Sequence, residues 1–169
     1  MALWSEIQHF QTLIVGIIGF AGVIATLWFN ARQARNQRID ERHHESEALR
    51  TALIEELKII RESVTENAAG SDKSQDAFVP TDPMDDAYRA FTHRIGLLSE
   101  GEVRKVMYAY LTLRTYNAKL FLIGVPTHTS ERHVKIPAPN IPLLIGMYKG
   151  LLDPMNQAIQ VMEQFRNRQ

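Results

Sequence analysis

Hydrophobic and polar positions divide the chain into an apolar opening and a mixed remainder. From Ile7 to Ala31 there is no Asp, Glu, Lys or Arg, and residues 12–29 are nearly all apolar. A helix of about 20 residues, at about 1.5 Å per residue, crosses the ~30 Å hydrocarbon layer of a bilayer. Because apolar residues would fill every face of this helix, a buried amphipathic helix is the weaker interpretation. The pattern therefore predicts an N-terminal tail and a transmembrane helix within residues 1–31.

The charges on either side of this stretch predict its orientation. A cleaved signal peptide would carry Lys or Arg before its apolar core, whereas the tail here holds only Glu6. Arginines follow the apolar stretch instead, and the positive-inside rule then places the N-terminus outside and the C-terminal domain in the cytoplasm. We expect Arg32, Arg35 and Arg38 to contact anionic headgroups, which makes the lipid bilayer the first predicted partner.

Small residues recur every three positions within the predicted span, at Gly16, Gly19, Gly22 and Ala25. Such a ridge lets a second helix backbone approach closely, so these residues are predicted to pack one span against another in a homo-oligomer. The alternative is that glycine is simply common in transmembrane helices. The spacing differs from the GxxxG pattern, and both interpretations stay open.

Residues 32–169 are predicted to form a cytoplasmic helical domain. Its segments are a membrane-proximal helix (32–67), a linker (68–82), two helices (83–123), a loop (124–141) and a kinked C-terminal helix (142–167). Apolar residues recur at intervals of three and four in the helical segments, and no segment alternates with period two. The predicted fold class is therefore all-α: one transmembrane helix that continues into a bundle of about four helices.

Two local signals support these helix assignments. Ser99 and Glu102 have the spacing of a capping box, which predicts a helix that begins after Ser99. In the C-terminal segment the apolar register continues through Pro154. The residue four positions earlier is Gly150, which yields most easily to the proline ring, so one kinked helix is predicted rather than two.

The composition excludes several kinds of functional site but does not identify a reaction. The formal net charge is zero, which gives no general attraction to nucleic acid, and cysteine is absent. A disulfide framework, a thiolate nucleophile and a cysteine zinc site are therefore excluded. No phosphate-binding loop, dinucleotide-binding or nucleophile-elbow motif occurs in the sequence. We expect no cofactor and no small-molecule substrate.

Arg38 and His43 are the strongest catalytic candidates. They form R-x-x-x-x-H, the spacing used by the HEPN superfamily of ribonucleases. On this motif the chain resembles the membrane-anchored HEPN-like accessory protein of type VI-B CRISPR systems. The resemblance implies that Arg38 steadies phosphate charge and that His43 handles a proton, across a dimer. A solvated, charged helix is the alternative that we favour, because arginine and histidine are dense in this region.

His128, Glu131 and His133 are the candidate metal ligands. Two histidines beside a carboxylate suit zinc or iron. Their spacing matches no helical HExxH arrangement, and no second ligand cluster occurs nearby. We therefore interpret them as surface residues of the loop and expect no metal.

A second resemblance concerns the whole architecture. A single span, the charged helix ending "ALRTALIEELKIIRES" and the segment "DDAYRAFTHRIGLLSEGEVRKVMYAYLTLRTYNAKL" are similar to uncharacterised bacterial single-pass membrane proteins, over about residues 13–122. The resemblance supports this architecture and a bacterial or phage origin, and it implies no known catalytic residues. With the predicted span, the expected location is the bacterial inner membrane.

The functional hypothesis is a non-enzymatic membrane protein that self-associates through its span and its bundle. A pore-forming or membrane-perturbing effector of anti-phage defence is the more specific form of this hypothesis. The alternatives are a membrane-tethered HEPN-like ribonuclease or CRISPR accessory, and an anchor or adaptor that binds a cytosolic protein or ribonucleoprotein.

Overall fold

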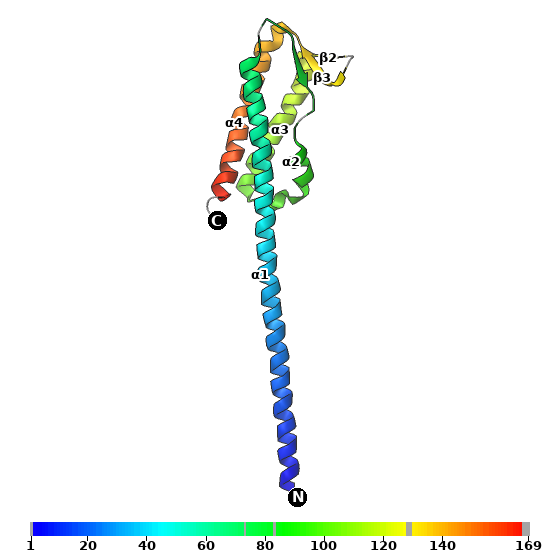
Figure 1. Ribbon diagram of the computed structural model, residues 1–169, viewed down its shortest axis with the longest axis vertical. Coiled ribbons are helices and arrows are strands. Elements are labelled where there is room, and N and C mark those ends of the chain that lie inside the picture. Colours follow the sequence, from blue (N-terminus) through cyan, green and yellow to red (C-terminus); the bar gives the residue numbers. More distant parts are fainter. Residues whose placement is uncertain (1, 73, 83, 128–129, 167–169) are drawn as a thin grey trace. The chain divides into compact units, whose positions relative to one another are not determined.

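The computed structural model describes residues 2–72, 74–82, 84–127 and 130–166, and gives only the backbone for residues 2–21, 127 and 130–132 (Figure 1). Its elements are α1 (Ala2–Gly70), β1 (Ala77–Pro80), α2 (Asp86–Phe91), the 3₁₀ helix η1 (Thr92–Leu97), α3 (Glu100–Ile123), β2 (Val125–Thr127), β3 (Ser130–Ile136), the 3₁₀ helix η2 (Ala138–Asn140) and α4 (Ile141–Arg166). The chain divides into two compact units, Met1–His44 and Glu45–Gln169. The second unit is called the body below.

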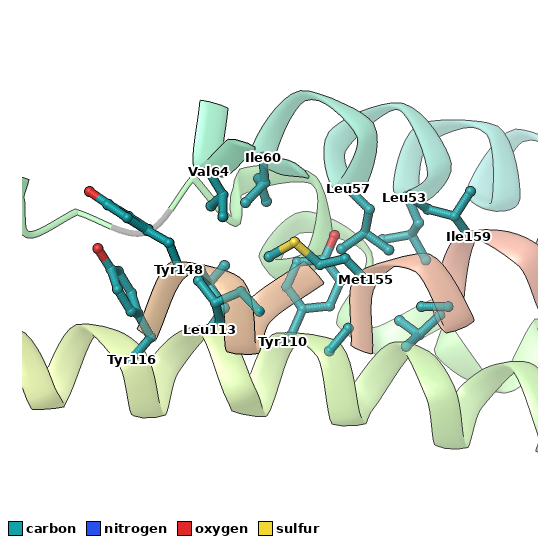
Figure 2. Packing of buried hydrophobic residues seen from close by; sticks show 14 of the residues in the cluster. Leu53, Leu57, Ile60, Val64, Tyr110, Leu113, Tyr116, Tyr148, Met155 and Ile159 are labelled. Atoms are coloured by element: carbon teal, nitrogen blue, oxygen red, sulfur yellow. The ribbon is translucent and has the colours of Figure 1, made fainter. Parts of the chain in front are cut away.

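Three helical segments enclose the core of the body: the C-terminal part of α1, α3 and α4. Figure 2 shows side chains of all three meeting in one cluster. On α1 the buried positions follow the helical period, at Leu49, Leu53, Leu57, Ile60 and Val64. Full burial of each such side chain stabilises the fold by about 1.5–3 kcal/mol. The predicted helical bundle is confirmed.

The beginning of α3 and the course of α4 follow local sequence signals. At the N-terminus of α3, the Ser99 amide donates to Glu102 Oε2 at 2.8 Å, and the Glu102 amide donates to Ser99 Oγ at 3.4 Å. The predicted capping box is therefore present. Helix α4 continues through the buried Pro154.

A three-stranded antiparallel sheet adds to the bundle, with strand order β1-β3-β2. Val79 lies opposite Val134, and both are buried. Pro80 and Pro126 lie on the two edge strands, where a missing N–H removes no bond from the centre of the sheet. The segments expected as a linker (68–82) and a loop (124–141) form these strands, which the sequence analysis did not predict. β1 and β2 are short and each contains a proline, and β1 pairs with a segment more than fifty residues away (Ala77 opposite Ile136), so local patterns did not indicate the sheet.

The predicted transmembrane helix at the start of the fold was also wrong. Among the residues that the structure describes, no helix combines the length and the hydrophobicity that crossing a membrane requires. The described side chains begin at Gly22, and only about ten residues separate it from the first arginine, Arg32. Residues 7–21, most of the predicted span, lie outside the described side chains. The predicted orientation, which depends on that span, stays a prediction.

Candidate interaction surface

Helix α3 carries apolar side chains on two opposite faces. One face is buried in the core and includes Val106, Leu113 and Leu120. The other, called the outer face here, is formed by residues within about 120° of arc on an ideal helix. Its larger side chains beyond the first turn are Arg104, Met107, Tyr108, Leu111, Arg114 and Leu122, with the smaller Thr115 and Ala118 between them. Large apolar side chains rarely gather on the surface of a monomer without a binding role.

Exposure of the outer face is substantial along its whole length. Met107 is 50%, Tyr108 55%, Leu111 63% and Leu122 82% exposed. These four side chains lie within sixteen residues of one helix, which spans about 24 Å at 1.5 Å per residue. The outer face is therefore long enough to pack against another helix.

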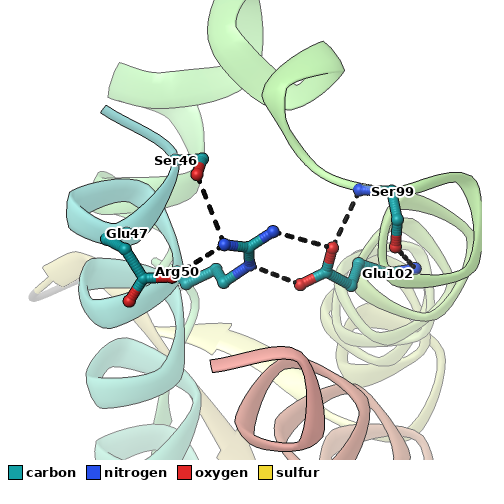
Figure 3. A network of polar contacts seen from close by, with 5 residues as sticks. All are labelled: Ser46, Glu47, Arg50, Ser99 and Glu102. Atoms are coloured by element: carbon teal, nitrogen blue, oxygen red, sulfur yellow. Dashed lines mark hydrogen bonds and ion pairs between the residues drawn. The ribbon is translucent and has the colours of Figure 1, made fainter. Parts of the chain in front are cut away.

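An ion pair inside the body attaches the N-terminal end of α3 to α1. Arg50 Nε donates to Glu102 Oε1 at 2.7 Å and Arg50 Nη2 donates to Glu102 Oε2 at 3.3 Å (Figure 3). Arg50 Nη1 also donates to Ser46 and Glu47. The Glu102 carboxylate is fully buried and accepts a bond from the Ser99 amide as well. Because all these groups are partnered, the buried charges fix the position of α3 against α1.

A hollow of about 420 Å³ opens beside the centre of the outer face. It is lined by Tyr88, Arg104, Met107, Tyr108, Tyr110, Leu111 and Arg114. The rings of Tyr88 and Tyr110 stack with centroids 4.0 Å apart, and the Arg114 guanidinium lies 6.0 Å from the Tyr88 ring. The walls are apolar and aromatic, with arginines at the edge.

Glu56 of α1 holds this aromatic wall in place. Its carboxylate accepts bonds from the amides of Ala87 and Tyr88, at 2.5 and 3.1 Å, and from the Tyr110 hydroxyl at 2.5 Å. Burial raises the pKa of Tyr110, and the bond to Glu56 raises it further, so the phenol stays protonated and donates. One carboxylate therefore ties the N-terminus of α2 to both α1 and α3.

Asp85 sets the position of the arginine at the edge of the hollow. Its carboxylate is completely buried, 2.6 Å from Arg89 Nε and 3.6 Å from Arg114 Nε. The side chains of both arginines remain about half exposed. Arg114 is thereby held over Tyr88 while its guanidinium still reaches the surface. The arrangement gives the hollow a cationic edge and an apolar floor.

The predicted catalytic pair does not form a site within one chain. Arg38 and His43 are both exposed on α1, in the unit Met1–His44. Five residues apart on a helix, their side chains leave the axis about 140° apart. The His43 ring lies in an edge-on contact with His44, with centroids 6.2 Å apart. The structure therefore does not bring the two residues together.

The other residues predicted on α1 are also exposed. Arg32 lies with its guanidinium 5.5 Å from the Trp28 ring centroid, and Arg35 projects from the same part of the helix. No atom lies within 4 Å of the position where a side chain on Gly22 would begin. Gly16 and Gly19 lie outside the described side chains, as stated above, and Ala25 is exposed. Headgroup contact and span packing stay predictions.

The predicted metal candidates are placed only in part. His133 is exposed on β3, where it lies opposite Pro80. His128 and the Glu131 side chain lie outside the described residues. In the part of the chain that is described, no three His, Cys, Asp or Glu side chains are grouped so that they could hold a metal ion.

The outer face was missed by sequence reasoning. Met107 follows the buried Val106 directly in the sequence, but its side chain leaves the helix about 100° away and is half exposed. The available signal was a second apolar series at helical spacing, formed by Tyr108, Leu111 and Leu122. A helix apolar on two sides needs two partners, and only one is provided by the body.

Comparison of the chain with known protein families, characterised proteins and solved structures finds no match. Both sequence resemblances therefore stay predictions.

Proposed function

We propose that this protein acts by assembling with copies of itself through the outer face of α3. The observation that carries the proposal is the second apolar face of α3, half exposed or more at Met107, Tyr108, Leu111 and Leu122. A two-fold symmetric dimer uses the same patch on both subunits, so the patch must be self-complementary. Its charges and its shape can be tested for this property.

If two α3 helices pair antiparallel around Leu111, no charged side chain of one copy faces a like charge of the other. Residues equally far from Leu111 then meet, so Tyr108 of one copy faces Arg114 of the other, each about 4.5 Å along the axis from the centre. Arginine over a tyrosine face is an attractive arrangement. Arg104 meets Ala118, which carries no charge. No like charges oppose one another in this register.

The ends of the helix add to the same complementarity. Glu100 is 89% exposed at the N-terminal end of α3, and Lys119 is exposed near the C-terminal end. In the antiparallel register these two groups lie within about 5 Å along the helix axis, which long side chains span. A parallel pairing would instead place Arg104 against Arg104 and Arg114 against Arg114. Like-charge contacts of this kind disfavour the parallel dimer.

Shape supports the same arrangement. Leu111 projects beside the hollow lined by Tyr88, Met107 and Arg114. Across a two-fold axis near Leu111, each copy offers one projecting side chain and one hollow. Desolvated aromatic and arginine side chains at the centre of an interface contribute most of its binding energy.

The mass of the purified full chain in solution tests the proposal. We expect a mass of twice 19.3 kDa or a multiple of it, and a monomer for Leu111→Glu. Ile59→Glu is the matched control, because Ile59 is 58% exposed on α1, comparable to Leu111, and lies outside the outer face. A monomeric wild-type chain would exclude self-assembly. An assembly that Leu111→Glu leaves intact would exclude this face.

The absence of cysteine makes the register directly measurable. Mixing a Tyr108→Cys chain with an Arg114→Cys chain should give a disulfide between the two, whereas Tyr108→Cys alone should crosslink poorly. The opposite result would indicate a parallel pairing. The pore-forming and anti-phage roles stay predictions of the sequence analysis.

A further inference from the structure

The arginines of the unit Met1–His44 lie on one side of α1. On an ideal helix, Arg32, Arg35, Arg38 and Arg42 fall within about 120° of arc. Trp28 and Ile39 share this arc, and Asp40 and Glu41 fall outside it. All of these side chains are exposed. The set of four arginines with Trp28 and Ile39 is called the arginine face below.

An apolar block lies immediately before the arginine face. Its members, each between 51% and 63% exposed, are Val23, Ile24, Leu27, Trp28 and Phe29. On a helix four of these side chains, all but Phe29, fall within about 140° of arc. Contact of this side of the block with water is unfavourable, and an apolar medium alongside the helix would relieve it.

We propose that this segment binds the surface of an anionic lipid bilayer. The arginine face supplies cations for lipid phosphates, and the apolar block supplies side chains for the boundary between headgroups and acyl chains. A helix segment with arginines on one face beside Trp and Phe is the composition of interfacial membrane binders. Trp28 serves both parts, because its ring lies in the apolar block while Arg32 rests over it at 5.5 Å.

Nucleic acid is the competing polyanion, and the apolar block decides against it. Arginines alone would suit a phosphate backbone equally well. A nucleic acid offers no apolar medium for Val23, Ile24 and Leu27, which would remain in water. A bilayer surface accommodates both groups of side chains at once.

Vesicle binding by the full chain tests this assignment. We expect strong binding to vesicles of phosphatidylcholine mixed with phosphatidylglycerol, weaker binding to phosphatidylcholine alone, and a decrease at high salt. Arg32→Gln combined with Arg35→Gln should weaken the partition into anionic vesicles about 30-fold, at about fivefold for each basic residue near such a surface. Lys149→Gln combined with Arg166→Gln is the control, since it removes the same charge from exposed positions of α4.

Fluorescence of Trp28 gives a second readout that charge alone would not change. The chain has two tryptophans, so Trp4→Phe leaves Trp28 as the single reporter. Its emission should shift to shorter wavelength on anionic vesicles and should be quenched by bromine-labelled acyl chains. Unshifted emission, or equal loss of binding in the α4 control, would overturn the proposal. So would tight RNA binding that depends on Arg32 and Arg35 without comparable binding to vesicles.

Discussion

Arg50 of α1 and Glu102 of α3 form a two-point ion pair in the interior of the body, with Nε–Oε1 and Nη2–Oε2 distances of 2.7 and 3.3 Å. The same carboxylate closes the capping box of α3 with Ser99. The hydrogen bond to Glu102 raises the pKa of Arg50, so the guanidinium stays charged. This pair determines where α3, and with it the outer face, lies on α1.

Replacing only one residue of the Arg50–Glu102 pair should lower the unfolding free energy much more than replacing both charged residues with neutral ones. Arg50→Met leaves a fully buried carboxylate without its cation, and we expect a loss of about 3–5 kcal/mol of unfolding free energy. Urea denaturation measures it. Arg104→Met is the control: Arg104 pairs with Glu100 on the surface, where such a pair contributes less than about 1 kcal/mol.

The double variant Arg50→Met with Glu102→Gln should recover most of this loss. Glutamine is neutral and still completes a capping box with Ser99. A double variant as unstable as Arg50→Met alone would show that the arginine acts through packing rather than through charge.

Gly124 should tolerate no side chain, whereas Gly146 should accept one. A Cβ at Gly124 would lie 2.1 Å from Val134 Cγ1 and 2.6 Å from Ile136 Cδ1, because β3 passes directly over the end of α3. We expect Gly124→Ala to lower the unfolding free energy by about 1–3 kcal/mol through overpacking. At Gly146, inside α4, nothing lies within 4 Å, so alanine should stabilise the helix by up to about 1 kcal/mol. Equal effects at the two positions in thermal unfolding would contradict this packing.

The helices of the body were predictable because their signals are local. The buried series from Leu49 to Val64 repeats at helical spacing, and the Ser99–Glu102 capping box sits at the observed start of α3. The sheet was not predictable in this way. Val79 and Val134 become neighbours only through tertiary structure, and β1 and β2 have only four and three residues.

The candidate surface was harder to predict than the fold. Tyr108 and Leu111 look like core residues in a sequence, since only the packing of α1 and α4 decides which face of α3 is covered. The ion pairs of Glu102 with Arg50 and of Asp85 with Arg114 could not be predicted either, because these arginines come from distant positions of the chain.

Acid should weaken the attachment of the sheet to the segment before α4. Asp76 contacts Lys135 Nζ at 2.8 Å and accepts from the Ala138 amide at 2.9 Å. The bond to Lys135, then that to Ala138, lowers the pKa of Asp76 below its usual value. Stability from this group is therefore present above the unfolded pKa of about 3.9 and is lost as the pH falls through the lower folded value.

Asp76→Asn should accordingly be less stable than the wild type at neutral pH, and the difference should shrink as the pH approaches 3, about one unit below the unfolded pKa. Urea titrations at several pH values measure this. Glu66→Gln, at an exposed position of α1, provides the charge-matched control. A difference between Asp76→Asn and wild type that stays constant with pH would rule out an ionic role for Asp76.

We expect that Arg38 and His43 do not form a ribonuclease site. Substitution of Arg38 by a neutral residue should weaken lipid binding, whereas substitution of His43 should not. A phosphodiester-cleaving site would lose about 10²-fold or more in rate without its acid–base group, so His43→Ala would abolish activity. Arg38→Lys would do the same, because lysine lacks the planar fork that holds a phosphate. The two side chains leave α1 about 140° apart, which argues against a joint site in one chain.

In the lipid-binding proposal only the charge at residue 38 matters. Arg38→Lys should bind anionic vesicles as the wild type does, Arg38→Gln should bind about fivefold more weakly, and His43→Ala should have no effect. RNA cleavage by the wild-type chain that disappears in both Arg38→Lys and His43→Ala would establish the ribonuclease instead.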